Sequence, residues 1–175
     1  ETARLGALEY LNVTDNAFTS LPGWLGELTA LVELRAYNNR ITTLPAEIGA
    51  LTRLRELHLN GNHLTGLPAT IGKLQSLEKL VLSKNSLSGL PAQIGQLQAL
   101  QELDFRFNNL VALPAEIGGL ESLQCLDLRA NALTTLPDSL GALPALRKID
   151  LRWNRLRGLP DCLTRLRARG CIVYT

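Results

Sequence analysis

Residues 51–73 read LTRLRELHLNGNHLTGLPATIGK, and the skeleton of this stretch, LxxLxxLxLxxNxLxxLPxxIGx, decides the fold of the chain. The same 23-residue skeleton recurs along the sequence without insertion or deletion. Its first leucine is repeated at Leu5, Leu28, Leu51, Leu74, Leu97, Leu120, Leu143 and Leu166. A fixed period of about 20 to 50 residues indicates a solenoid, in which each coil buries its apolar side chains against its neighbours.

Each repeat predicts a short strand, a bend and a helical turn. Leu57 and Leu59 alternate with polar residues, which is typical of a strand with one buried face. Asn62 follows at the bend, where its amide can bond backbone groups that the curved chain leaves unpaired. Pro68 favours an extended approach, and residues 69–72 fit one helical or 3₁₀ turn.

This pattern resembles the leucine-rich repeat. Its variant, LPxxIGxLxxLxxLxLxxN, is similar to that of plant intracellular Ras-group, animal Ras-suppressor-like and many bacterial leucine-rich-repeat proteins. The resemblance covers residues 5–165 and implies an α/β solenoid, a right-handed horseshoe with a parallel sheet on its concave face and short helical or 3₁₀ turns on its convex face. The shared residues are those of the skeleton, so no binding residue is carried over from the family.

We expect one domain over residues 1–175, with seven repeats over 5–165 and a C-terminal cap over 166–175. The segment LTRLRAR followed by Gly170 predicts a helical turn, and CIVYT predicts a last strand that protects the sheet edge. The chain has no Met and enters its first repeat after four residues, so we expect the N-terminal cap to be missing and the chain to be a fragment. Phe18 replaces a core leucine and is expected inside.

Composition favours an intracellular, cytoplasmic protein. The three cysteines, Cys125, Cys162 and Cys171, lack disulfide-framework spacing, and no apolar run approaches the ~18 residues of a membrane span. Charge is uneven: residues 1–142 carry 10 basic and 14 acidic side chains, and residues 143–175 carry 8 basic and 2 acidic. The positive end is either a partner surface or a solubilising cap.

Function is expected at the positions that vary between repeats, because equivalent residues of neighbouring strands line up about 4.8 Å apart on the outward face. We predict that a partner binds the concave face through two groups of residues. The N-terminal patch consists of Tyr10, Arg35, Tyr37, His58 and Asn60. The C-terminal patch consists of Asp104, Arg106, Phe107, Asp127, Arg129, Asp150, Arg152 and Trp153. Arginine and aromatic residues dominate interface hot spots, although paired Asp and Arg can also simply neutralise each other.

We predict no metal, cofactor or catalytic site. His58 and His63 lack a cysteine or carboxylate at metal-site spacing, so both are expected to be exposed polar residues. The sequence contains no GxSxG, phosphate-binding loop or HExxH motif. Cys125 is expected to face outward.

The predicted function is therefore a non-enzymatic protein–protein interaction module or scaffold that binds a protein or peptide on its concave face. The alternative is the recognition arm of a larger multidomain protein, namely a bacterial effector, ubiquitin ligase or kinase. If it is an effector, we expect the protein to be delivered into a host cell. The interleaved Asp104, Asp127 and Asp150 argue against nucleic-acid binding. Self-association through exposed aromatic residues is a further alternative.

Overall fold

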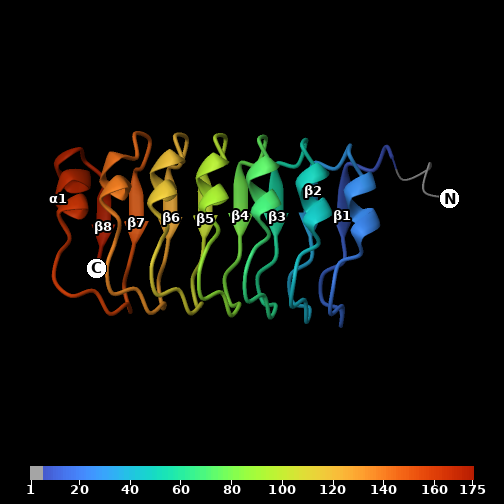
Figure 1. The fold of residues 1–175 in the computed structure, drawn as a ribbon, viewed down its shortest axis with the longest axis horizontal. Coiled ribbons are helices and arrows are strands. Elements are labelled where there is room, and N and C mark those ends of the chain that lie inside the picture. Colours follow the sequence, from blue (N-terminus) through green and yellow to red (C-terminus); the bar gives the residue numbers. More distant parts are fainter. Residues whose placement is uncertain (1–5) are drawn as a thin grey trace.

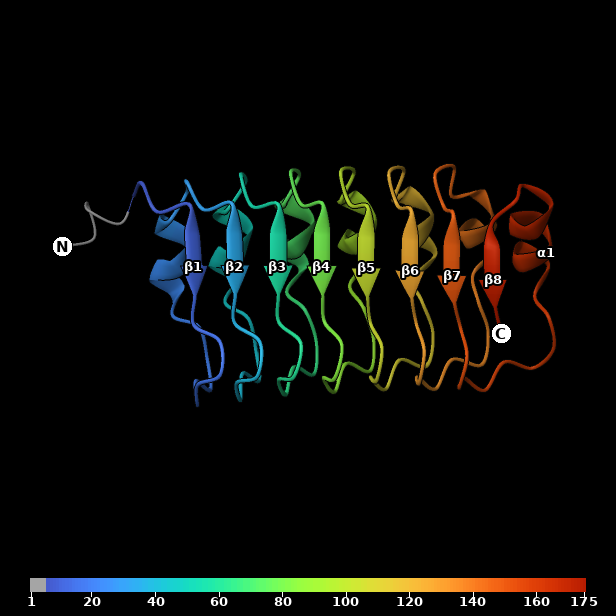
Figure 2. The ribbon, with the colours of Figure 1, turned by 180° about the vertical axis from the view of Figure 1, so that it is seen from behind.

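The computed structural model describes residues 6–175, so Leu5 and the expectation of a missing N-terminal cap lie outside the described residues. One parallel sheet runs the length of the molecule, with its strands in sequence order (Figure 2). The eight strands are β1 Tyr10–Asn12, β2 Glu33–Arg35, β3 Glu56–His58, β4 Lys79–Val81, β5 Glu102–Asp104, β6 Cys125–Asp127, β7 Lys148–Asp150 and β8 Ile172–Tyr174.

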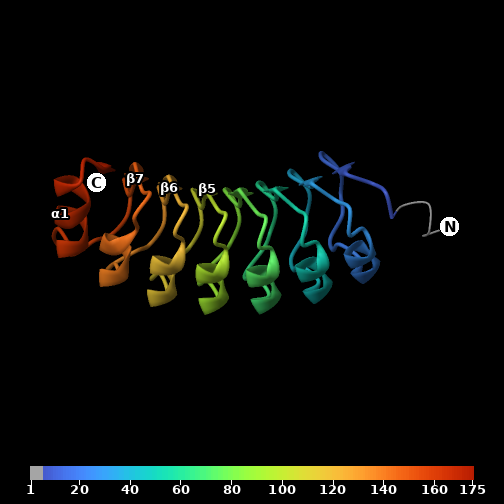
Figure 3. The same cartoon turned by 90° about the horizontal axis from the view of Figure 1, so that it is seen from above.

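A row of short helical turns covers one face of the sheet, in front of the strands in Figure 1 and behind them in Figure 2. The 3₁₀ turns are η2 Gly23–Glu27, η3 Ala46–Ala50, η4 Ala69–Lys73, η5 Ala92–Gln96, η6 Ala115–Gly119 and η7 Asp138–Ala142. Each follows a proline in an extended conformation, such as Pro68 with φ −68° and ψ 148°. Seen from above, the sheet lines the gently concave side and the turns line the convex side (Figure 3). The expected leucine-rich-repeat solenoid is confirmed.

Successive turns pack closely because a glycine sits between them. A Cβ atom added to Gly49 would lie 2.6 Å from the backbone oxygen of Thr70, closer than such atoms approach in proteins. The space between turns and sheet is filled by the skeleton leucines and isoleucines, together with the fully buried Phe105.

The repeated asparagine links each coil to the next. Asn62 donates from Nδ2 to the oxygens of Ala36 and Leu59, both at 2.9 Å, and its Oδ1 accepts from the Ile41 amide at 2.9 Å. Equivalent bonds recur at Asn39, Asn85, Asn108, Asn131 and Asn154. These amides satisfy buried backbone groups that short strands leave without partners.

The C-terminal end departs from the repeat. Helix α1, Asp161–Ala168, begins within the stretch assigned to repeat seven and packs against η7. Strand β8 then pairs with β7, placing Tyr174 beside Asp150. None of the helices in residues 6–175 has the length and apolar character needed to cross a bilayer.

The expectation that Phe18 is a core residue is wrong, because its side chain is 46% exposed. Its amide is fixed by Asn39 Oδ1 at 3.1 Å, so the backbone follows the repeat. Within residues 6–175, however, no coil precedes the one that carries Phe18, and the side chain has a neighbour on one side only.

Candidate functional site

The C-terminal patch contains a ladder of charged side chains, formed by the aspartates that end β5, β6 and β7 and by the arginines two residues beyond them. Arg106 donates from Nε to Asp104 Oδ1 at 2.9 Å and from Nη2 to Asp104 Oδ2 at 2.8 Å. The Arg129–Asp127 and Arg152–Asp150 pairs repeat this two-bond geometry in the next two coils. Each arginine lies two residues after its aspartate, so both side chains leave the same face of the sheet.

The pairs are also joined between strands. Arg106 Nε lies 3.5 Å from Asp127 Oδ2, and Arg129 Nε lies 3.5 Å from Asp150 Oδ2. Burial opposes ionisation of Asp150, but its hydrogen bonds from Arg152 outweigh burial and lower its pKa. The Asp127 hydrogen bond raises the pKa of the Arg129 guanidinium. The ladder pairs three carboxylates with three guanidinium groups, so its formal net charge is zero.

Aromatic side chains flank this ladder. The Arg152 guanidinium carbon lies 5.8 Å from the centre of the Trp153 ring and 5.1 Å from that of Tyr174. These are cation–π distances. Trp153 is 66% exposed and Phe107 is 47% exposed. Tyr174 was not among the predicted site residues, because its place beside Asp150 depends on the register of the last strand.

Phe107 and Trp153 occupy an unusual backbone position. Their φ angles are 54° and 62°, in the left-handed region that bulky residues rarely adopt. The equivalent residues of the other repeats share this conformation: Asp15, Asn38, Gly61, Lys84 and Ala130. The sequence carries a signal for it, since Asp, Asn and Gly fill the position in the first three repeats, but sequence reasoning missed it.

The N-terminal patch lies over β1, β2 and β3. The Arg35 guanidinium carbon is 5.6 Å from the centre of the Tyr10 ring, and Arg35 Nε pairs with Glu33 Oε1 at 2.5 Å. Tyr37 and Asn60 are half-buried just beyond their strands, where the Asn60 oxygen accepts from the Asn38 amide at 2.9 Å.

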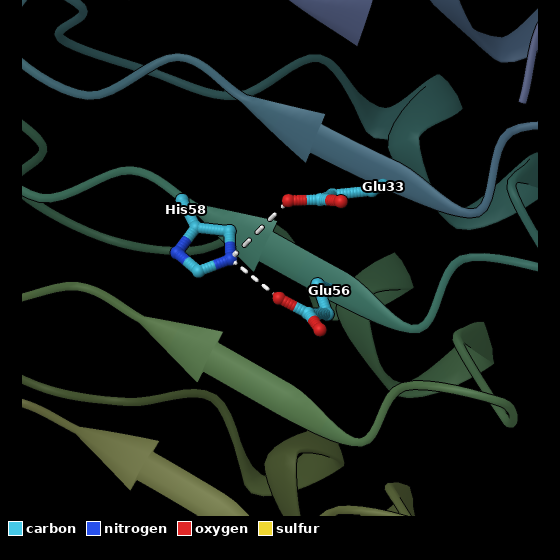
Figure 4. A group of neighbouring side chains, drawn as sticks. All are labelled: Glu33, Glu56 and His58. Carbon is cyan, nitrogen blue, oxygen red and sulfur yellow. Dashed lines mark hydrogen bonds and ion pairs between the residues drawn. The ribbon is translucent and has the colours of Figure 1, made fainter. Parts of the chain in front are cut away.

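The surroundings of His58 differ from the prediction of an isolated, exposed polar residue, which is wrong. Its side chain is 16% exposed and lies among Glu33 and Glu56 (Figure 4). His58 Nε2 lies 2.9 Å from Glu56 Oε2 and 3.9 Å from Glu33 Oε1. Sequence reasoning overlooked Glu56, although it lies two residues before His58 and so on the same face of β3. It missed Glu33 because this residue comes one repeat earlier in the sequence and reaches His58 only across the sheet. His63 and Cys125 are exposed, as expected.

A shallow hollow of about 210 Å³ lies on the same face as the ladder. Its lining includes Glu102, Asp104, Arg106, Cys125, Asp127, Lys148 and Asp150. Because the aspartates here are bound by arginines, the surface is suited to recognition rather than to proton transfer.

Comparison with known proteins agrees with this architecture. A family model described as a leucine-rich repeat region matches residues 1–86 and 80–167. No curated protein matches the chain. Among solved structures, a leucine-rich-repeat protein of Leptospira interrogans is similar, with a TM-score of 0.92 and 38% identity over 98% of this chain and 43% of that protein.

Two plant receptors are similar as well. The peptide hormone receptor RGFR1, solved in complex with RGF2, gives a TM-score of 0.84 and 35% identity over 96% of this chain and 27% of the receptor. The ectodomain of the Arabidopsis thaliana receptor kinase GASSHO1/SCHENGEN3, solved with CASPARIAN STRIP INTEGRITY FACTOR 2, gives a TM-score of 0.83. Its identity is 39% over 98% of this chain and 22% of the ectodomain. The chain thus spans less than half the length of each of these proteins. The matched residues and the repeating coils together show that the chain belongs to the leucine-rich-repeat family.

Proposed function

We propose that this chain is a non-enzymatic interaction module that binds an extended segment of a protein or peptide along its concave face, centred on the C-terminal patch. The observation that carries the proposal is the ordered Asp–Arg ladder with exposed aromatic rings beside it. Each guanidinium is already fixed by two hydrogen bonds, so a partner would find these groups in place and lose little side-chain entropy on binding.

The ladder retains donors for a partner. The hydrogen bonds of Arg106, Arg129 and Arg152 use Nε and Nη2. Their Nη1 groups have no hydrogen-bond partner among residues 6–175. Three such groups, each two residues beyond the end of one of three adjacent strands, recur at about 4.8 Å, and they can donate to carbonyl or carboxylate oxygens of an extended chain.

The aromatic residues supply the apolar part of the contact. Trp153 and Phe107 lie next to arginines of the ladder, and this pairing of aromatic and arginine side chains is typical of binding hot spots. Because the ladder is internally neutral, the partner need not be strongly charged. That property separates the proposal from nucleic-acid binding, which depends on unpaired basic groups.

The two plant receptors support the proposal by analogy, since both were solved with peptide or protein factors bound. The alternative is a recognition arm of a larger bacterial effector, ligase or kinase. Its support is the length of the related proteins, of which this chain spans 43% or less. An intracellular, reducing setting is part of the proposal and rests on the three unpaired cysteines.

The test is selection of a displayed random-peptide library on the immobilised chain, followed by affinity measurements on variants. We expect Trp153→Ala to weaken the selected peptides at least about 10-fold, the loss expected for a hot spot. Trp24→Ala is the matched control, because Trp24 is 48% exposed but lies on η2, on the convex side. Peptides that lose affinity equally in both variants, or in neither, would refute a site on the C-terminal patch. Light scattering of the parent checks self-association.

A further inference from the structure

We propose that Glu33, Glu56 and His58 form a binding site for a divalent transition-metal ion of the zinc class, on the concave face between β2 and β3. The site lies at the other end of the sheet from the ladder and does not depend on the proposed peptide binding. Two carboxylates and one imidazole are ligands that zinc accepts, with a fourth position left for water or a partner group.

The three side chains already converge. His58 Nε2 is 2.9 Å from Glu56 Oε2 and 3.9 Å from Glu33 Oε1, and one ligand atom from each residue lies within 4.8 Å of the other two (Figure 4). Bonds of about 2.0–2.1 Å to a tetrahedral ion place its ligand atoms about 3.4 Å apart. Small side-chain rotations would therefore bring all three atoms to bonding distance.

The register of the sheet builds this cluster. Glu33 pairs with Glu56, and Arg35 pairs with His58, across β2 and β3. Like charges in adjacent register repel each other. Arg35 compensates one carboxylate, and Lys79 is paired with Glu102 at 2.9 Å, so Glu56 is left beside a histidine. A dication between the two carboxylates would replace repulsion with attraction.

Arg35 would act as an outer partner rather than as a competitor. Arg35 Nε bonds Oε1 of Glu33, the same oxygen that lies 3.9 Å from His58 Nε2, and so orients the carboxylate. A carboxylate has about four lone-pair sites, so an ion can take a remaining site on Oε1 or, after a small rotation, Oε2. Carboxylate ligands of metals are commonly hydrogen-bonded in this way, and the bonds fix their orientation.

The other repeats show why this site is local. On β5, β6 and β7 the residue equivalent to His58 is an aspartate, and it is bound by an arginine two positions later. In the third repeat that later position is Asn60, so His58 is free to turn back toward the carboxylates. In those three repeats the aspartate at the His58 position is therefore already paired with its own arginine, whereas His58 in the third repeat is available to a ligand.

The test is titration of the purified chain with Zn²⁺ by calorimetry and with Co²⁺ by visible absorption, under reducing conditions. We expect one ion per chain. Removing even an outer-shell partner typically weakens metal affinity by about 10- to 100-fold, so His58→Asn and Glu56→Gln should each weaken it at least 10-fold. His63→Asn and Cys125→Ser are matched controls, since both residues are exposed potential ligands outside the cluster.

Binding that survives His58→Asn, or that is lost in His63→Asn or Cys125→Ser, would overturn the proposal, as would no binding by the parent. Circular dichroism of each variant without metal separates a lost ligand from a lost fold. Trp153 lies outside the cluster, so Trp153→Ala should weaken the selected peptides and keep the Zn²⁺ affinity of the parent. Failure of one proposal is therefore distinguishable from failure of the other.

Discussion

Substitution of one ladder asparagine, Asn85→Ala, should destabilise the fold far more than its size suggests. Asn85 is buried in the central coil, where its Oδ1 accepts from the Leu64 amide at 3.0 Å. Its Nδ2 donates to the oxygens of Leu59 at 2.9 Å and Leu82 at 3.0 Å. Alanine removes all of these bonds.

The magnitude follows from which groups lose their only partner. The buried Leu64 amide is orphaned, which costs roughly 1–3 kcal/mol. The Leu59 and Leu82 oxygens still accept from Asn62 and Asn108, so each loses one of two bonds, at about 0.5 kcal/mol apiece. We therefore expect the free energy of unfolding to fall by about 2–4 kcal/mol, a large share of the 5–15 kcal/mol typical of domains.

Urea unfolding followed by circular dichroism measures this loss, with an unchanged dependence on denaturant as the check for a comparable transition. Asn16→Ala is the matched control, because Asn16 is exposed and, among residues 6–175, its side chain bonds only the Val13 and Thr14 oxygens of its own coil. It should lose less than about 1 kcal/mol, since water can replace its bonds. Equal losses at both positions would refute the view that this amide ladder joins the coils.

Three further outcomes are expected. Lys84→Gly should raise the free energy of unfolding by about 0.5–1 kcal/mol, measured by urea unfolding. The reason is that relief of about 1–2 kcal/mol of strain from the left-handed backbone exceeds the entropic cost of glycine, and a lower free energy of unfolding would contradict this. Hydrogen bonds from Arg152 lower the pKa of Asp150 below 3.8, so the stability that this carboxylate adds to the fold is fully present above pH 3.8 and is lost as the pH falls through the lowered pKa. The free energy of unfolding of Asp150→Asn should therefore change less with pH in that range, as acid unfolding measures. One of three thiols should react readily with a disulfide reagent in the folded chain, and Cys125→Ser should abolish that phase, because burial covers the other two cysteines.

The fold could be predicted because one period carries all of its information. Leu57 and Leu59 mark the buried face of a strand, Asn62 marks the bend, and Pro68 marks the start of the turn. Each repeat has these residue types at the same positions, so residues that are 23 apart in the sequence pair across neighbouring strands. The exposure of Phe18 could not be predicted from its position in the repeat. Burial at that position requires a neighbouring coil on both sides.

The candidate sites were only partly predictable. Comparing residues at one position of each repeat does not show which residues at different positions contact each other. Asp104 and Arg106 belong to two predicted columns, but their two-bond geometry depends on side-chain rotamers. His58 meets Glu33 only because two neighbouring strands place adjacent columns together. Glu56 lies two residues before His58, and Glu33 lies one full repeat before Glu56, so a search of the sequence that combined these two offsets would have found this cluster.

The left-handed column gives a separate reason to look for function in the C-terminal half. Its first three residues, Asp15, Asn38 and Gly61, tolerate this backbone conformation. Phe107 and Trp153 do not, and each accepts roughly 1–2 kcal/mol of strain while leaving about half or more of its ring in water. Packing alone would favour glycine or asparagine at both positions. A bulky aromatic ring that is strained, exposed and adjacent to a fixed guanidinium is better explained by a partner that covers it.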